Sequence, residues 1–270
     1  MALVPKEKLP WYHQFCSSVL KTGPIPKHVA FIMDGNRRYA VKKHVERIEG
    51  HSQGFDKLAE VLQWCQELGV KEVTVYAFSA ENFKRSKEEV NSLMELARSK
   101  FERILKEKGK LEELGVRLCI LNVCAAYTSR LEITQAVKDI KWGVEEGLLY
   151  ENDITERLMD RTLQIPKVDL LIRTSGEVRL SDFLLWQSSL SYLSFLKHLW
   201  PELTVWDFYG AILLYQQSYK VIKEERELNE KEMMEEESLC EKDSLDPSEV
   251  QRKRRQRVEN FITKLNEKRL

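Results

Sequence analysis

Residues 28–40 read HVAFIMDGNRRYA, an apolar run that stops abruptly at Asp34. A Gly-Asn pair follows the aspartate and leads into two adjacent arginines, Arg37 and Arg38. A near-continuous apolar run of this length is typical of a strand that is covered on both faces of a parallel sheet. The stretch therefore predicts a buried strand whose carboxyl end carries one carboxylate beside two guanidinium groups.

Three later segments have the same apolar character and predict further buried strands. They are VTVYAF at 73–78, RLCILNVCAAY at 117–127 and VDLLIR at 168–173. Apolar residues recur at helical spacing in the stretches 55–65 and 90–105, which lie between the predicted strands. This alternation of strands and helices predicts an α/β fold with a central, mostly parallel sheet flanked by helices.

The composition divides the chain into three parts. We expect an N-terminal helix in residues 1–25, the main α/β domain in residues 26–220 and a helical appendage in residues 221–270. The N-terminal helix is amphipathic, so it either contacts a membrane or packs on the body of the protein. The appendage is highly charged, with a turn near Pro247, and both a solvated helix and a partner-binding hairpin fit its pattern.

Bulk properties exclude several classes of protein. The 43 basic residues balance the 43 acidic ones, so the basic excess of a general nucleic-acid binder is absent. The five cysteines form no CxxC pair, which argues against a zinc site or a disulfide framework. No secretory signal and no apolar run of 18 residues is visible. The motifs of P-loop NTPases, dinucleotide-binding proteins, zinc proteases and serine hydrolases are also missing.

Polar residues follow three of the predicted strands at their carboxyl ends. They occupy 34–38, 79–85 and 173–181, and arginine occurs in each stretch. In open α/β sheets ligands bind at this edge, and arginine binds phosphate oxygens in a bidentate manner. A lone aspartate such as Asp34 can share Mg²⁺ with substrate phosphates. The sequence therefore predicts that Asp34 holds Mg²⁺ while the arginines hold phosphate oxygens of the same substrate.

Each of these residues also has a simpler explanation. An arginine at a strand end often forms a surface ion pair, and Asp34-Gly35 could be only a turn. His51 could cap the next helix or lie on the surface. The functional interpretation is favoured because all three clusters fall where a parallel sheet places a ligand.

Three stretches together resemble the signatures of the cis-prenyltransferase (undecaprenyl diphosphate synthase) family. They are HVAFIMDGNRRYA at 28–40, EGHSQGFDKLAEVLQWCQELGVKEVTVYAFSAENFKRSKEEV at 49–90 and DLLIRTSGEVRLSDFLLWQ at 169–187. The resemblance covers most of residues 10–220 and is closest to the animal catalytic subunits. It implies the Mg²⁺-dependent addition of isopentenyl diphosphate units to farnesyl diphosphate, giving long-chain polyprenyl (dehydrodolichyl) diphosphate for dolichol synthesis and protein glycosylation.

The resemblance also implies roles for individual residues. It assigns the metal to Asp34 and catalytic positions to Asp34, Asn82 and His51. Residues expected around the allylic diphosphate are Gly35, Asn36, Arg37, Arg38, Arg47 and His51. Those near the reacting centre are Asn82 and Arg85, and those that grip the diphosphate of isopentenyl diphosphate are Arg173, Arg179 and Ser181. Ser79 is also expected to bind substrate. The helical stretch 90–105 is expected to line a tunnel for the growing chain or simply to pack in the core.

The resemblance further implies a partner subunit and a membrane location. Single-chain members end in an Arg-x-Gly tail that completes the site, whereas this sequence ends in NEKRL. A subunit of the Nogo-B receptor type is therefore expected to supply that tail in a heteromer. Peripheral association with the cytoplasmic face of the endoplasmic reticulum membrane is also expected.

The sequence departs from the family pattern after Arg117. The family has a further strand and helix there, but a parallel crossover needs about a dozen residues and none are available between Val116 and Tyr127. We therefore expect the loss of one strand and one helix. A catalytically impaired isoform or paralogue that still binds the partner subunit is the alternative function.

Overall fold

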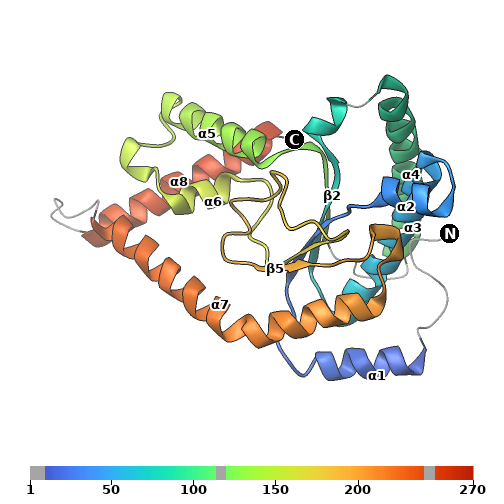
Figure 1. Cartoon of the computed structure of the whole chain (residues 1–270). Coiled ribbons are helices and arrows are strands. Elements are labelled where there is room, and N and C mark those ends of the chain that lie inside the picture. Colours follow the sequence, from blue (N-terminus) through green and yellow to red (C-terminus); the bar gives the residue numbers. More distant parts are fainter. Residues whose placement is uncertain (1–9, 85, 114–119, 240–246, 270) are drawn as a thin grey trace.

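A computed structural model describes residues 10–84, 86–113, 120–239 and 247–269. Within these residues five strands form one sheet, in which every pairing is parallel and the order is β3-β2-β1-β4-β5. Figure 1 shows the strands with helices arranged around them. The strands are β1 His28–Ile32, β2 Glu72–Ser79, β3 Ile120–Tyr127, β4 Leu170–Arg173 and β5 Tyr192–Phe195. The predicted α/β class, with a parallel sheet flanked by helices, is confirmed.

Helices precede, connect and follow the strands. Their bounds are α1 Trp11–Leu20, α2 Asn36–Lys43, α3 Arg47–Leu68, α4 Lys87–Glu113, α5 Ser129–Glu145, α6 Glu156–Thr162, α7 Val205–Leu239 and α8 Pro247–Arg269, with the short 3₁₀ turns η1 Ala80–Lys84, η2 Glu151–Asp153 and η3 Trp200–Glu202. Helix α5 begins where the Thr128 hydroxyl accepts a hydrogen bond from Leu131 N, a regular N-cap. No helix in the described part of the chain is long and apolar enough to span a bilayer.

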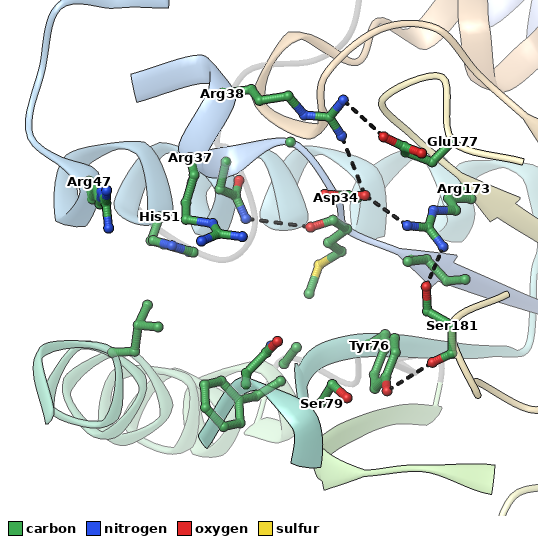
Figure 2. A pocket seen from close by; sticks show the side chains of 18 of the residues that line it. Asp34, Arg37, Arg38, Arg47, His51, Tyr76, Ser79, Arg173, Glu177 and Ser181 are labelled. Carbon is green, nitrogen blue, oxygen red and sulfur yellow. Dashed lines mark hydrogen bonds and ion pairs between the residues drawn. The ribbon is translucent and has the colours of Figure 1, made fainter. Parts of the chain in front are cut away.

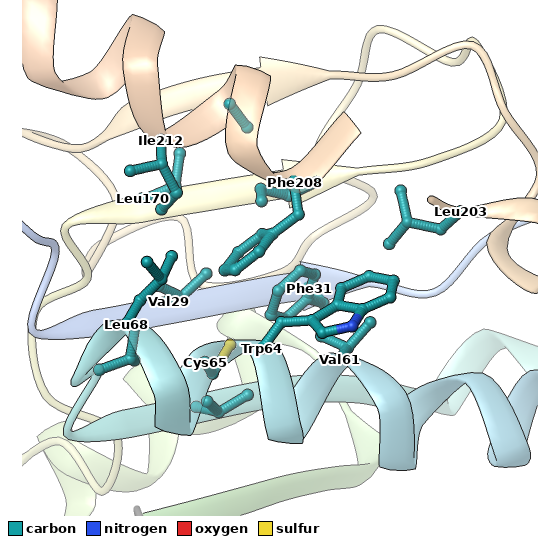
Figure 3. Packing of buried hydrophobic residues seen from close by; sticks show 14 of the residues in the cluster. Val29, Phe31, Val61, Trp64, Cys65, Leu68, Leu170, Leu203, Phe208 and Ile212 are labelled. Carbon is teal, nitrogen blue, oxygen red and sulfur yellow. The ribbon is translucent and has the colours of Figure 1, made fainter. Parts of the chain in front are cut away.

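One face of the sheet is covered by helices α1, α3 and α7. The central strand β1 is buried along its whole length, as predicted, and Val29 and Phe31 point into this layer. Phe31 lies edge-on to Trp200, with 5.8 Å between ring centroids. It also lies close to Phe208 of α7, as Figure 3 shows, with 6.1 Å between the ring centroids. Trp64 of α3 stacks on Phe208. These aromatic contacts join the two helices across the strand and make this the main core.

The opposite face is covered differently, by an irregular segment that follows β4. Ala30 and Ile32 of β1 pack there with Phe183 and Leu184, both of which are fully buried. Phe183 stacks on Tyr76 of β2 with ring centroids 4.5 Å apart. A loop, rather than a helix, therefore fills the space above this side of the central strands.

Strand β3 corrects one expectation, because it is an edge strand and is only partly covered. Cys124 is its only buried side chain, and Ile120 is 61% exposed. In the described residues, β2 is the only strand that pairs with it. An apolar run shows that a strand is favourable, but it does not show whether neighbouring elements cover that strand. The first part of the predicted segment, 117–119, lies outside the described residues.

Strand β5 was not predicted from the sequence, because Tyr192–Phe195 is short and interrupted by serine.

The last two helices fold back onto the main body. Helix α7 continues without a break through residue 220, where composition suggested a domain boundary. Helix α8 buries Phe261 and Leu265 in a cluster with α5 and α6. Its Arg257 donates two hydrogen bonds to the buried carboxylate of Asp153, at 2.8 and 3.0 Å. The apolar face of the appendage is therefore in contact with its own chain.

Arg226 of α7 ties this helix to the amino-terminal end of the sheet. Its guanidinium donates to the Asp169 carboxylate at 2.5 Å and to the carbonyl oxygens of Val168 and Leu190. The other Asp169 oxygen accepts from the backbone N–H of His28 at 3.0 Å. One side chain thus holds β1, β4 and the approach to β5 in register.

Replacing Arg226 with alanine is expected to lower the free energy of unfolding by about 2 kcal/mol. The mostly buried Asp169 carboxylate and two backbone carbonyl groups would lose their hydrogen-bond donor. Urea denaturation followed by circular dichroism measures this. Lys223→Ala on the same helix removes an exposed ion pair with Glu227 and should change the value by less than about 0.5 kcal/mol. Equal effects of the two variants would contradict the proposed tie.

A buried hydrogen-bond chain crosses the same end of the sheet at His28. The carbonyl of Lys167 can only accept, so the His28 Nδ1–H donates to it at 3.0 Å and Nε2 accepts from the Thr74 hydroxyl at 2.7 Å. Asn122 of β3 in turn donates to Thr74 Oγ1 at 3.1 Å. Burial lowers the pKa of His28, although Glu72 and Asp169 oppose the shift.

Acidification should therefore destabilise the fold through His28. Below about pH 6.5, His28 is protonated in the unfolded chain but stays mostly neutral in the folded chain, because its pKa is lower there. The free energy of unfolding should therefore fall as pH decreases from 7.5 to 5.5. Urea denaturation at several pH values measures the slope. His28→Gln should flatten it, and an unchanged slope in that variant would show that other groups cause the pH dependence.

Candidate functional site

A cavity of about 710 Å³ opens at the carboxyl ends of β1, β2 and β4. Every residue that the sequence predicted for the site lines it except Arg85, which lies outside the described residues. The lining residues among those predicted are Asp34, Gly35, Asn36, Arg37, Arg38, Arg47, His51, Ser79, Asn82, Arg173, Arg179 and Ser181. Figure 2 shows cationic side chains of α2, α3 and β4 facing Tyr76 and Ser79 of β2 across this space.

Helix α2 directs its amino terminus into the cavity. Gly35 precedes it with φ of +110°, a left-handed conformation that suits glycine, and a Cβ there would lie 2.9 Å from Leu199. No side chain of the described residues caps this helix, and its first turn contains no acid. Its first backbone N–H groups and the positive end of its dipole therefore favour an anion.

Two glycines of α3 allow α2 to approach closely. A Cβ at Gly50 would lie 2.6 Å from the carbonyl oxygen of Asn36, and one at Gly54 would collide with the Asn36 side chain. The Trp200 indole N–H donates to the Gly54 carbonyl at 2.6 Å and fixes the other side of the helix. The buried Oδ1 of Asn36 has no hydrogen-bond partner in the described structure. The position of the α2 amino terminus is therefore set by close packing.

Arg173 organises the opposite side of the cavity. Its side chain is only 4% exposed and donates to Asp34 Oδ2 at 2.9 Å and to Ser181 Oγ at 2.7 Å. Burial alone would raise the pKa of Asp34, but the hydrogen bond and charge of Arg173, with Ser175 and Arg38, lower it below its usual range. Asp34 is thus an ionised carboxylate held between two guanidinium groups.

Glu177 connects the two basic sides of the cavity. Its carboxylate accepts from Arg38 at 3.4 Å and forms a short ion pair with Arg179. Glu177 lies within one of the family-like motifs but was assigned no role from the sequence, and Tyr76, in the middle of a strand, was not predicted for the site. The alternation of arginine and acid in 173–179 was the available signal for Glu177, whereas Tyr76 had none.

His51 and Arg47 each had a simpler explanation, a helix cap for His51 and a surface ion pair for an arginine, and the geometry tests both. Glu46, not His51, is the N-cap of α3, and His51 faces the cavity one turn into the helix. Arg47 also lines the cavity, but it pairs with Glu89 of α4 at 2.9 Å and its side chain is 65% exposed. A surface ion pair therefore describes part of the environment of Arg47.

Apolar residues form the remaining wall. They are Ile32, Met33, Val41, Ala77, Phe78 and Leu93. Leu93 belongs to α4, the helix predicted to line a tunnel, while the side chains at 101 and 103–105 of the same helix lie outside the described ones. The tunnel remains a prediction. The site as described combines a polar part that fits charged oxygens with an apolar part that fits hydrocarbon.

The donor set fits a metal ion that is shared with a ligand. The described residues contain no group of three or more His, Cys, Asp or Glu side chains that could hold a metal by themselves. Asp34 is ionised, 31% exposed and directed at a space between arginines. One such carboxylate with phosphate oxygens is a usual arrangement for Mg²⁺.

A family model described as "Putative undecaprenyl diphosphate synthase" matches residues 32–121 and 112–222 of the chain. Together the two matches cover more than half of the sequence and include the whole cavity. The chain belongs to the cis-prenyltransferase family. Its relatives include the human dehydrodolichyl diphosphate synthase complex subunit, which is 52% identical over 260 residues, 84% of this chain and 78% of that protein.

More distant relatives are also prenyl diphosphate synthases. A tritrans,polycis-undecaprenyl-diphosphate synthase (geranylgeranyl-diphosphate specific) of Pyrococcus abyssi is 42% identical, covering 76% of this chain and 89% of the archaeal one. The solved structure of lavandulyl diphosphate synthase from Lavandula x intermedia, in complex with dimethylallyl diphosphate, is 30% identical with a TM-score of 0.64. It covers 71% of this chain and 95% of its own. The chain therefore resembles prenyl diphosphate synthases in both sequence and fold.

The comparison with the human relative supports the predicted loss of a segment. The aligned 84% of this chain is about 227 residues, so about 33 of the 260 aligned positions have no counterpart here. The two stretches matched by the family model meet at residues 112–121, just where the strand and helix were expected to be missing.

Substituting Gly54 by alanine should displace α2, because the new methyl group collides with Asn36. We expect the free energy of unfolding to fall by about 1–3 kcal/mol in urea denaturation. Gly210 of α7 is the matched control, since a Cβ there meets nothing within 4 Å. Gly210→Ala should stabilise the chain by about 0.5–1 kcal/mol, and a similar gain at Gly54 would contradict the packing argument.

Proposed function

We propose that the chain condenses isopentenyl diphosphate with farnesyl diphosphate and extends the product in cis to a long-chain polyprenyl (dehydrodolichyl) diphosphate. The observation that carries this proposal is the presence of two basic clusters on either side of Asp34 in one cavity. A condensation of two diphosphate esters needs two such clamps, held so that the reacting carbons meet.

The allylic diphosphate is assigned to the α2 side. The first N–H groups of α2 point there, and Arg37, Arg38, Arg47 and His51 line the same region. Cleavage of the allylic C–O bond releases pyrophosphate, and preorganised cations and N–H donors stabilise its developing charge. A Mg²⁺ ion held by Asp34 and by phosphate oxygens would neutralise part of that charge.

The diphosphate of isopentenyl diphosphate is assigned to the side formed by Arg173, Arg179 and Ser181. Arg173 already holds Ser181 at 2.7 Å, so this clamp is assembled before a ligand arrives. Arg179 is paired with Glu177, and a bound diphosphate would compete for its guanidinium. Ser79 and Asn82, with Arg85, are assigned to the space between the two diphosphates, where carbon–carbon bond formation and proton loss take place.

A partner subunit and a membrane surface complete the proposal. The human relative is named as a subunit of a complex, which supports assembly with a Nogo-B receptor-like partner. Helix α1 packs on the body through Leu20 and leaves an exposed stripe of Trp11, Phe15 and Val19. A stripe of this kind supports peripheral attachment to the cytoplasmic face of the endoplasmic reticulum membrane.

The alternative is an impaired subunit that retains partner binding. The edge strand β3 and the deficit of about 33 aligned positions relative to the human subunit favour it, because the two stretches matched by the family model meet at residues 112–121, next to β3. The intact set of lining residues favours catalysis. The active synthase and the impaired subunit belong to the same family and differ in whether the chain catalyses the condensation.

Asp34→Asn tests the proposal, because the variant keeps the shape of the side chain and removes its charge. The chain is purified with the Nogo-B receptor subunit, and Mg²⁺-dependent incorporation of labelled isopentenyl diphosphate onto farnesyl diphosphate is measured. We expect long-chain product from the unmodified chain and a loss of at least about 100-fold in the variant. Asp207→Asn, which removes a carboxylate paired with Thr204 and His198 outside the cavity, should retain activity.

The outcomes separate the two functions. A stable complex that gives no product would support the impaired subunit. Equal product from the unmodified chain and from Asp34→Asn would contradict the role of this carboxylate.

A further inference from the structure

The segment that carries Arg179 and Ser181 has an unusual backbone. Ser181, Asp182 and Leu184 all have positive φ, at 51°, 57° and 47°. Residues other than glycine rarely adopt a positive φ. When they do, the surrounding structure must hold the backbone in this conformation. Ser181 is also the residue that Arg173 binds through its hydroxyl. The geometry of the clamp thus depends on whatever stabilises this turn.

The first turn of α5 restrains this segment through Asp182, in addition to the Tyr76 hydroxyl that donates to the Ser181 carbonyl at 3.4 Å. Ser129 N donates to the Asp182 carbonyl at 2.7 Å, and Arg130 N donates to Oδ1 at 3.2 Å. The Arg130 side chain completes the contact with a 2.7 Å ion pair to Oδ2. Asp182 is therefore the anion at the amino terminus of α5, where the helix dipole favours a negative charge.

The same turn of α5 also holds the residues that follow. Leu185 N donates to Ser129 Oγ at 2.8 Å, and Gln187 donates to the Glu132 carboxylate at 2.8 Å. Between Asp182 and Leu185, the side chains of Phe183 and Leu184 are fully buried against the sheet. The segment is fixed at several points, but Asp182 is the one adjacent to Ser181.

We propose that Asp182, held by the amino terminus of α5 and by Arg130, is a positioning residue that sets the clamp for the second diphosphate. It does not line the cavity itself, so its effect passes through Ser181 and Arg179. The allylic side is built by α2 and α3, and in the described structure the hydrogen bonds from α2 to this segment run from Arg38 to Ser175 and Glu177 rather than to Asp182. The inference rests on the proposed function, because it assigns the turn to isopentenyl diphosphate.

Asp182→Gly is the informative variant. Glycine accepts the positive φ, so the substitution removes the carboxylate without adding backbone strain. In the full-length chain with Mg²⁺, the Kd for isopentenyl diphosphate should rise about ten-fold. The Kd for farnesyl thiodiphosphate, an allylic analogue that resists cleavage, should stay within about two-fold. Asp182→Asn, which keeps the acceptor for Arg130 N, should recover most of the affinity.

Arg130→Ala and Lys141→Ala form a matched pair on the same helix. Both side chains are about three-quarters exposed and ion-paired, but Lys141 pairs with Glu145 at the far end of α5. We expect a rise of about three-fold in the Kd for isopentenyl diphosphate for Arg130→Ala and no change for Lys141→Ala.

A substrate-free measurement reports on the tether directly. Trypsin cleavage after Arg179, followed by mass spectrometry, should accelerate in Asp182→Gly and remain unchanged in Lys141→Ala. Equal weakening of both diphosphates with a lower Tm would overturn the inference in favour of a general structural role, as would unchanged affinity and cleavage. If the unmodified chain binds neither diphosphate, the proposed function fails and the assignment of the turn fails with it, whatever the cleavage rates.

Discussion

The buried guanidinium of Arg173 is the constraint on which the rest of the site depends. A charge in this position must be paired and hydrogen-bonded, because removing it from water is costly. The parallel pairing of β1 with β4 places Ile32 beside Arg173, so that Asp34, two residues further on, reaches the guanidinium. Its second terminal nitrogen, Nη1, donates to Ser181 Oγ and to the Arg179 carbonyl, while the buried Nε–H has no partner in the described structure. One buried charge thereby connects the metal-binding candidate with the second clamp.

The two faces of the sheet differ in what covers them. Helices α1, α3 and α7 pack on one face and form the main core around Phe31. On the other face, the segment that covers the central strands is the one that carries the Arg179–Ser181 clamp, anchored by Phe183. Because the same residues fill the core and shape the site, a substitution in this segment would affect stability and ligand geometry together. The tether from α5 lets the clamp keep a strained turn without losing that packing.

The charged carboxyl-terminal helices are part of this architecture. Arg226, beyond the boundary that composition suggested, holds the amino-terminal end of the sheet through Asp169 and neighbouring carbonyl groups. Helix α8 buries Phe261 against α5 and α6, the helices next to the tether. Support for the clamp therefore comes in part from residues far along the chain, whose hydrophilic composition alone fitted either a solvated helix or a partner-binding hairpin.

The sequence by itself determined the buried strands β1, β2 and β4, the α/β class and most of the polar residues that line the cavity. Apolar runs and the polar residues after them are local signals, and the family resemblance added Arg47 and His51. Tertiary structure decided what depends on neighbours. It made β3 an exposed edge, since burial requires a covering element that the letters ILNVCAAY do not specify. It also brought Glu177 between two arginines and Asp182 onto the α5 amino terminus. Such contacts join residues up to about 140 positions apart, and no spacing rule along the chain encodes them.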